Sequence, residues 1–356
     1  MKIVHTHTGL LPIPPNGWGA IEKLIWFYHQ HSLNKGFASE IKYTDDINKN
    51  DHDIVHAHIG NLANILHKKD IPYFFSMNDH HAYLYGKNSP IFKENYEAAK
   101  NSVHTFVSAK FLVDYFDLPN VSYLSLGVDN SFFKPKNKIN EHRLLCVANN
   151  GFCHDSSEDR KGFSYAIEAA RRLNMPITIA GPKNNQKFFD KMNVKYDKLE
   201  IRYDLTEQQL LETYQKHSIF IHPSILEGGH PNLTLLEAQA CGLTVLATFE
   251  KNNDLKGLIR IERNHRLIAN KIEEAIENHD YYRKISLESA LDNDWSMVVD
   301  RMINIYKKGI MTYHFHKCGY CGNEWSHNNK MRGNESAHTC VMCNSIQWKK
   351  KRCQLR

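Results

Sequence analysis

The stretch that decides the fold is EGGHPNLTLLEAQACGLTVLAT, residues 227–248. Its residues predict a loop, a helix and a strand in that order. Pro231 suits the first helical turn, and Gly242 ends the helix before the strand 243–248. The helix would bury an apolar stripe at helical spacing, made of Leu233, Leu236 and Ala240. The stretch is therefore typical of one α/β unit.

Two acids in this stretch need an explanation, because Glu227 lies on the loop and Glu237 lies inside the helix. The loop also contains Gly228, Gly229 and His230. A glycine loop that leads into a helix N-terminus offers free backbone N–H groups and positive dipole, which favour an anion such as phosphate. An acid beside that point is better placed to accept hydrogen bonds from hydroxyls. The combination indicates a phosphorylated sugar or a nucleotide.

Length and composition are those of a soluble globular protein with room for two domains and a small appendage. The chain has 356 residues, of which 42% are hydrophobic and 24% charged,. It has no run of about eighteen apolar residues, so no membrane span is expected. The N-terminus lacks a signal-peptide pattern. We therefore expect a cytoplasmic protein, in the host cytoplasm if it is viral.

Four of the eight cysteines form two CxxC pairs near the C-terminus. This pattern favours a reducing compartment and a metal site over a disulfide framework. Eighteen residues separate the pairs, a spacing typical of a zinc ribbon, and four thiolates leave no open position on the ion. We therefore predict a structural Zn²⁺ held by Cys318, Cys321, Cys340 and Cys343.

The net charge of +6 is concentrated at one end of the chain. From Thr312 onward there are eight basic and two acidic residues, whereas the preceding residues are neutral overall. The run Lys349–Arg352 is the densest part. Such a segment indicates either an anionic partner or a solvated basic terminus. Zinc with four thiolates carries about −2, so the module would retain about +4.

Apolar strands alternate with helices along most of the chain, which predicts two doubly wound α/β domains in tandem. The polar stretch 134–142 reads as a linker between them. A crevice would lie between the carboxyl ends of the two sheets. The expected strands are 1–8, 53–59, 73–79, 104–110 and 121–127, followed by 143–150, 175–181, 199–204, 218–224 and 243–248. The expected helices are 19–36, the stretch around 92–101, 163–174, 206–217 and 294–308.

Taken together, these segments resemble the retaining, nucleotide-sugar-dependent glycosyltransferases of the family four type, which have the two-domain GT-B fold. The resemblance covers roughly residues 1–308. The markers that carry it are PNGWGAIEKL, LGVDNSFFKP, RKGFSYAIEAA, ITIAGP, HPSILEGG, LLEAQACGLTVLA and DWSMVVDRMINIY. It implies an acceptor-side domain over 1–135, a nucleotide-sugar-binding domain over 140–292, a closing helix over 293–310 that packs back toward the first domain, and the basic zinc ribbon over 312–356.

The resemblance also implies roles for individual residues. The loop with Gly17 and Gly19 would approach the donor diphosphate, where glycines permit close backbone contact. Lys161 would neutralise the departing diphosphate. Glu237 would bind the ribose hydroxyls, and Glu227 would face the transferred sugar. The amides between the two acids, at Gly228, Gly229 and His230, would hold the phosphates.

Three positions depart from the family pattern. Glu227 and Glu237 are ten positions apart instead of eight, which suggests an insertion in the loop. Asn149 replaces the arginine common after the first strand of the second domain, and Arg160 would have to supply that charge. Asn78 stands where many members have a histidine, which leaves His80 or His81 as displaced alternatives. We take His80 as the histidine that assists catalysis.

Paired histidines on two predicted strands leave two interpretations open. His5 and His7 are two positions apart, as are His56 and His58, so the members of each pair share a strand face. They could line the crevice or bind a metal. The resemblance implies no catalytic metal, so we favour packing or contacts with the acceptor.

The acceptor is open between different classes of partner. One hypothesis is hydroxymethylated pyrimidine in DNA, of the kind phages glycosylate, with the basic ribbon binding phosphates. Another is a lipid-linked or surface glycan at the membrane face, reached by peripheral contact. A third is a degenerate transferase that acts as a nucleic-acid-binding or assembly protein. The expected donor in the first two cases is a nucleotide sugar.

Overall fold

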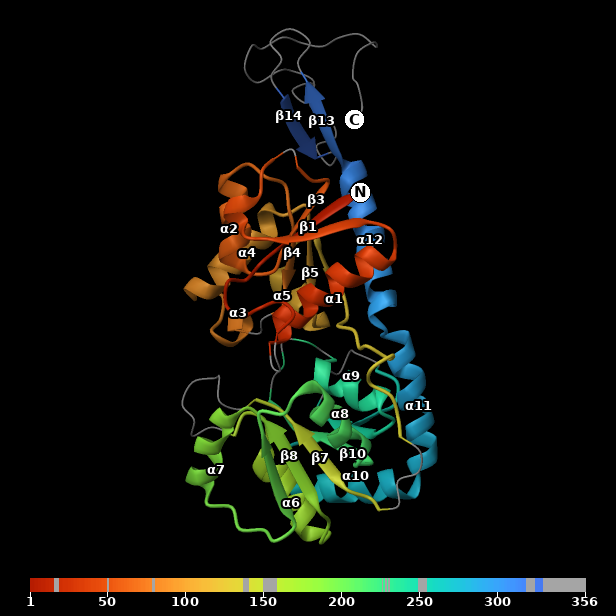
Figure 1. The fold of residues 1–356 in the computed structure, drawn as a ribbon. Coiled ribbons are helices and arrows are strands. Elements are labelled where there is room, and N and C mark those ends of the chain that lie inside the picture. Colours follow the sequence, from red (N-terminus) through yellow and green to blue (C-terminus); the bar gives the residue numbers. More distant parts are fainter. Residues whose placement is uncertain are drawn as a thin grey trace. The chain divides into compact units, whose positions relative to one another are not determined.

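The computed structural model describes residues 1–15, 19–49, 51–78, 81–136, 141–149, 159–225, 227, 229, 231–248, 255–317 and 324–328. Met1–Asp300 forms one compact unit, and Arg301–Arg356 forms a second. The first unit contains two six-stranded parallel sheets, each with helices packed on it (Figure 1). The predicted α/β class is therefore confirmed.

The first sheet has the strand order β2-β1-β3-β4-β5-β6. Its strands are β1 (Lys2–Thr6), β2 (Ala38–Lys42), β3 (Ile54–Ala57), β4 (Phe74–Met77), β5 (His104–Val107) and β6 (Val121–Tyr123). Its helices are α1 (Ala20–Asn34), α2 (Gly60–Lys68), α3 (His81–Leu84), α4 (Pro90–Asn101) and α5 (Lys110–Phe116), with a 3₁₀ turn at Thr44–Asp46. The central strands β3 and β4 are buried along their whole length, as expected of a parallel sheet covered on both faces,.

The second sheet has the order β12-β11-β10-β7-β8-β9. Its strands are β7 (Leu144–Val147), β8 (Ile177–Gly181), β9 (Leu199–Tyr203), β10 (Ile219–His222), β11 (Thr244–Ala247) and β12 (Leu258–Arg260). Its helices are α6 (Phe163–Arg172), α7 (Gln186–Met192), α8 (Glu207–Gln215), α9 (Leu233–Ala240), α10 (His265–Glu277) and α11 (His279–Asp292), with a 3₁₀ turn at Lys183–Asn185.

The ten predicted strands are all present, but sequence patterns missed two edge strands. Edge strand β2 has the polar sequence ASEIK, and only Ser39 in it is buried, so it lacks an apolar run. Edge strand β12 is three residues long. Both pair with an apolar neighbour that supplies most of the burial, and this pairing is a tertiary property.

Each sheet has a topological switch point, where successive strands are added on opposite sides. In the second sheet this point lies between β7 and β10, because the chain runs outward from β7 through β8 and β9 and then returns to β10. In the first sheet it lies between β1 and β3, with β2 on the other side of β1. Ligands of open α/β sheets bind outside the carboxyl ends of the strands at such points. The topology therefore singles out two places in the molecule.

Helix α9 begins two residues later than Pro231 suggested. Asn232 is its N-cap, and the Asn232 carboxamide oxygen accepts a hydrogen bond from the Leu235 N–H at 3.0 Å,. Pro231 thus precedes the cap, so its expected place in the first turn was wrong. Gly242 follows the helix with φ of 77°, the left-handed conformation that ends many helices,.

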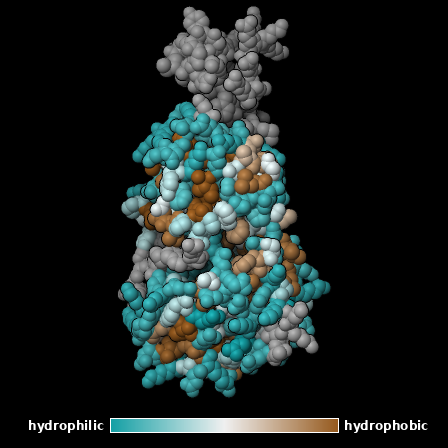
Figure 2. Space-filling view, in the orientation of Figure 1, coloured by the Kyte–Doolittle hydropathy of each residue, from teal (hydrophilic) through white to brown (hydrophobic). Residues whose placement is uncertain are grey.

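The last elements are helix α12 (Trp295–Thr312) and the antiparallel hairpin of β13 (Tyr313–Lys317) and β14 (Glu324–Asn328). At the start of α12, Trp295 is buried and stacks on Phe27 of α1, with ring centroids 5.1 Å apart. Among the described residues, no helix is both long enough and apolar enough to cross a bilayer. On the face in Figure 2, hydrophilic residues predominate, and hydrophobic ones form only small patches.

Candidate active site

The switch point of the second sheet brings together two loops. One runs from the end of β7 to helix α6, and the other runs from the end of β10 to helix α9. The predicted residues Arg160 and Lys161 lie on the first loop, and Glu227 lies on the second. Residues more than sixty positions apart in sequence therefore meet at one edge of the sheet.

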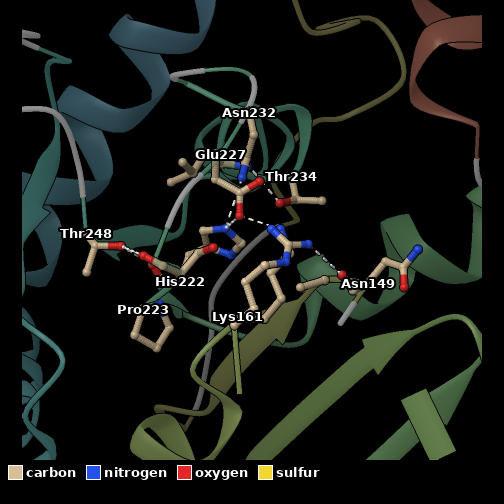
Figure 3. Close-up of polar contacts among 12 residues, drawn as sticks. Asn149, Lys161, His222, Pro223, Glu227, Asn232, Thr234 and Thr248 are labelled. Atoms are coloured by element: carbon tan, nitrogen blue, oxygen red, sulfur yellow. Dashed lines mark hydrogen bonds and ion pairs between the residues drawn. The ribbon is translucent and has the colours of Figure 1, made fainter. Parts of the chain in front are cut away.

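A chain of polar contacts connects the two loops (Figure 3). The Lys161 ammonium forms an ion pair with the Glu227 carboxylate. The Nε2 atom of His222, the last residue of β10, lies 2.9 Å from the same carboxylate oxygen and 3.0 Å from Asn232 Nδ2. The Nε2 atom cannot both donate to Glu227 and accept a hydrogen bond from Asn232. We assign the proton to Nε2, which then donates to Glu227, because a hydrogen bond to a carboxylate is the stronger of the two. Glu227 thus has a cation on one side and an imidazole donor on the other.

Burial determines the electrostatics of this group. The side chains of Lys161 and Glu227 are only 8% and 12% exposed. Burial alone would raise the pKa of Glu227, but the Lys161 charge and the His222 hydrogen bond hold it well below its usual range,. Burial also lowers the pKa of Lys161, and Glu227 opposes that shift. The site therefore holds an ionised carboxylate whose charge is matched by a buried cation.

The loop that carries Lys161 is fixed by its backbone. The Asp159 carboxylate accepts hydrogen bonds from the Phe163 and Ser164 N–H groups, both at 2.8 Å, and so caps helix α6. The Arg160 carbonyl accepts from Ile225 N–H and from the Arg263 guanidinium, both at 2.9 Å. These bonds tie the two loops together at the site.

Arg160 lies close to Asn149, the residue that stands where the family commonly has an arginine. Its guanidinium donates to the Asn149 carbonyl oxygen at 3.3 Å, directly after strand β7. Counted over the whole residue, Arg160 is 9% exposed and Lys161 next to it is 6% exposed. The two cationic residues therefore occupy neighbouring, largely buried positions at the end of the first strand of the second sheet.

Glu237 has a different environment from Glu227. Its carboxylate accepts a hydrogen bond from the Tyr214 hydroxyl at 2.9 Å, and burial raises its pKa, partly offset by Lys23 and by that bond. Glu237 lines a small pocket with Lys23 of α1 and Glu207 of α8, which form an ion pair at 2.7 Å. The other lining residues are Phe27, Gly127, Val128, Asp129, Phe133, Leu233 and Trp295.

Two predicted glycines lie within the described residues. Gly19 is the N-cap of α1 with φ of 144°, and a side chain there would meet Pro15. A side chain at Gly229 would meet Leu126. The backbone conformation of Gly19 therefore favours glycine, whereas the shortest contact of a Cβ at Gly229 would be with the end of the flexible Leu126 side chain,. The predicted residues outside the described part of the chain are Gly17, His80, Gly228, His230 and the cysteines 318, 321, 340 and 343. Asn78 accepts a hydrogen bond from the Ser108 hydroxyl.

Sequence reasoning missed three residues that organise the site. His222 donates to Glu227, Asn232 caps helix α9 beside His222, and Tyr214 binds Glu237. His222 could have been found, because it lies near the carboxyl end of the predicted strand 218–224, before the glycine loop, where parallel strands present functional side chains,. Tyr214 gives no such signal, because it lies inside helix α8 and reaches Glu237 only through tertiary packing.

One family model matches the part of the chain that contains this site. Residues 147–279 match the family described as Glycosyl transferases group 1. This segment contains the Lys161–Glu227 pair and Glu237. A search of curated proteins found no match to the chain.

Solved structures share the two-sheet fold at low sequence identity. Sucrose-phosphate synthase from Thermosynechococcus elongatus is 11% identical with a TM-score of 0.69, over 86% of this chain and 98% of that one. HepE from Anabaena, in complex with UDP and glucose, is 11% identical with a TM-score of 0.64, over 86% and 100%. The catalytic domain of starch synthase IV from Arabidopsis thaliana, bound to ADP and acarbose, is 10% identical with a TM-score of 0.61, over 87% and 99%.

These structures have the GT-B fold, which the two parallel six-stranded sheets of this chain match. Residues 147–279 thus match the group 1 glycosyltransferase family, and the protein is an enzyme of the glycosyltransferase class.

Proposed function

We propose that the protein binds a nucleotide-sugar donor at the carboxyl end of its second sheet and transfers the sugar with retention of configuration. The observation that carries the proposal is the buried Lys161–Glu227 pair at the switch point, with Arg160 beside it. Adjacent, partly desolvated cations suit a diphosphate, whose charge they neutralise. HepE and starch synthase IV, which share the fold, are described with UDP and ADP.

In this proposal Glu227 is the counter-ion of Lys161 until the donor arrives. A diphosphate that approaches Lys161 competes with the carboxylate for the ammonium group. Glu227 then turns to the sugar hydroxyls, with His222 still donating to it. A buried charge would thus have a partner at each stage, which avoids the large cost of leaving it unpaired.

The protein's contribution to the chemical step is positioning and electrostatic stabilisation. The acceptor hydroxyl attacks from the face that the leaving group vacates, and a leaving phosphate oxygen takes the hydroxyl proton. Lys161 and Arg160 stabilise the charge that develops on the departing nucleoside diphosphate. Glu237, in its pocket with Lys23 and Glu207, accepts hydrogen bonds from the ribose hydroxyls.

The test measures donor turnover in two variants. Lys161→Ala and Glu237→Ala should each lower turnover of the nucleotide sugar at least tenfold, which corresponds to about 1.4 kcal/mol. Lys183→Ala is the matched control, because Lys183 is exposed on the same sheet's 3₁₀ turn and should retain wild-type turnover. Wild-type rates in both site variants would refute the assignment.

For the acceptor we propose hydroxymethylated pyrimidine in DNA. The excess positive charge of the chain lies after residue 311. The first CxxC pair falls in sequence between strands β13 and β14, as in a zinc ribbon, so a structural Zn²⁺ on the four cysteines is part of the proposal,. A module of this charge would bind DNA phosphates without sequence preference.

One experiment distinguishes the acceptor classes. The protein is offered labelled nucleotide sugars together with unmodified DNA, hydroxymethylated DNA and a lipid extract. Label on hydroxymethylated DNA supports the proposal, and label on lipid shows a glycan-directed enzyme instead. No donor hydrolysis and no transfer with any nucleotide sugar would indicate a binding or assembly protein and would refute the enzymatic proposal.

A further inference from the structure

A second group of polar residues lies at the switch point of the first sheet. His5 is on β1, His56 is on the adjacent strand β3, and His58 follows β3 directly. His5 and His56 are partners in the parallel register, so their side chains project from the same face of the sheet, as does that of His58 two positions on,. Their exposures are 0%, 0% and 2%.

The nitrogens of the three imidazoles converge. One nitrogen from each ring lies within 4.8 Å of the other two. The closest pair is His5 Nδ1 and His58 Nε2, at 3.2 Å. Two nitrogens bound to one tetrahedral zinc ion at about 2.0–2.1 Å would be about 3.3 Å apart. This pair therefore has almost the spacing of two ligands on one metal ion, and the nitrogen of the third ring lies within 4.8 Å of both.

Hydrogen bonds within the cluster do not satisfy it. Among the described residues, His5 Nε2 and His58 Nδ1 are buried without a hydrogen-bond partner. Whichever of the two rings donates in the 3.2 Å contact, one buried lone pair and one buried N–H are left without a partner, which is unfavourable,. A metal ion between His5 Nδ1 and His58 Nε2 would use the lone pairs of those two nitrogens and place an N–H on His5 Nε2 and on His58 Nδ1,.

The surroundings suit a metal ion held by neutral imidazoles. Burial lowers the pKa of His5 to about 3, with a further contribution from His29, and burial also holds the pKa values of His56 and His58 well below normal. His56 Nε2 contacts the Ser76 hydroxyl at 2.7 Å, the kind of outer bond that orients a metal-bound imidazole,.

We propose that His5, His56 and His58 bind one Zn²⁺ ion, which joins strands β1 and β3 at the switch point of the first sheet. Three imidazoles leave one position of a tetrahedral ion for water or hydroxide. A hydroxide would reduce the charge that the ion brings into this apolar region. The ring of Tyr28 packs against all three histidines, with centroid distances of 5.8–6.2 Å, and closes the site on the α1 side.

The test is the zinc content of the full-length protein after equilibrium dialysis against Zn²⁺. His5→Gln and His58→Gln should each bind one zinc ion per chain fewer than wild type. The cysteines are unchanged in every variant, so their contribution cancels in the difference. His142→Gln is the matched control, because His142 is half-buried and lies beside another histidine ring, that of His279 at 5.1 Å. It should retain the wild-type content. Equal zinc content in all four proteins would overturn the proposal.

A second measurement does not depend on the folding of the variants. Crystals of the wild-type protein grown with Zn²⁺ are measured at the zinc absorption edge. An anomalous peak between the three imidazoles supports the site. Zinc bound elsewhere with no peak there, or a water molecule in that position, would show that the cluster is a hydrogen-bonded histidine network and would overturn the proposal.

Discussion

At the scale of single residues, the two acids of the 227–248 stretch have opposite electrostatics. Glu227 is ionised beside Lys161, whereas Glu237 is buried next to a tyrosine, where burial raises its pKa. A carboxylate paired with a buried cation is costly to remove, because the cation is left without a partner. A buried acid without a cation in contact is itself costly when ionised. The same residue type therefore stabilises the fold at one position and destabilises it at the other.

Glu237→Gln should raise stability while it lowers activity. The raised pKa means that the folded state binds the Glu237 proton more tightly than the unfolded chain, so ionisation at neutral pH opposes folding. Gln removes that charge and can still accept from Tyr214. We expect a gain of about 1 kcal/mol at about pH 8, a typical size for a point mutation. The gain should disappear below about pH 4, where the acid is protonated in both states.

Denaturant unfolding of both proteins across this pH range measures the effect. Glu212→Gln is a suitable comparison, because Glu212 is exposed on helix α8. It should show no gain at high pH. A constant difference between Glu237→Gln and wild type at every pH would mean that the ionisation of Glu237 is not its cause.

At the scale of elements, the site depends on how closely two loops approach each other. Gly162 precedes helix α6 with φ of 74°, and a Cβ there would lie 2.3 Å from the Pro223 carbonyl oxygen. No residue with a side chain fits that gap. Because Pro223 follows His222 directly, the contact also determines where the end of β10 and its hydrogen bond to Glu227 lie.

Gly162→Ala should therefore lower both stability and donor turnover. Gly86→Ala is the matched control, since Gly86 has nearly the same φ of 77° but no atom within 4 Å of the added Cβ. The control should lose about 1–2 kcal/mol from the left-handed conformation alone and keep its turnover. Gly162→Ala should lose more and turn over donor at least tenfold more slowly. Equal stability and activity in the two variants would show that the contact with Pro223 has no influence on the site.

At the scale of the whole molecule, charge is segregated along the chain. The first 311 residues contain equal numbers of acidic and basic side chains, and the last 45 hold the entire excess. A body without net charge neither repels an anionic donor nor binds it nonspecifically over its surface. A basic segment, in contrast, raises the local concentration of a polyanion. This arrangement is the physical basis for proposing DNA as the acceptor.

Replacing Lys349, Lys350, Lys351 and Arg352 by Gln in the full-length chain should weaken retention on DNA. Each phosphate contact contributes about 0.9 to the slope of log K against log salt, so the slope should fall by as much as three to four. The matched control replaces four exposed lysines of the second sheet's region, Lys183, Lys187, Lys191 and Lys195, with the same change in net charge. Equal loss in both quadruple variants would indicate a net-charge effect and no specific role for the C-terminal run.

The sequence by itself determined most of the elements and much of the site's composition. Apolar strands such as Leu144–Val147 are continuous and short, and helices such as α6 have clear apolar spacing, so local pattern suffices. Lys161, Glu227 and Glu237 could be proposed because a glycine loop, a helix start and a family resemblance coincided there. Edge strand β2 could not be predicted, because its burial comes from pairing with β1.

Only the tertiary structure decided which residues meet. The return of the chain from β9 to β10 places Lys161 against Glu227, and the crossover from β2 to β3 places His5 beside His56. No local pattern encodes such pairs, because each partner satisfies only its own strand or loop. The pairing of charges and the convergence of three imidazole rings follow from strand order, and strand order is set by packing over the whole sheet.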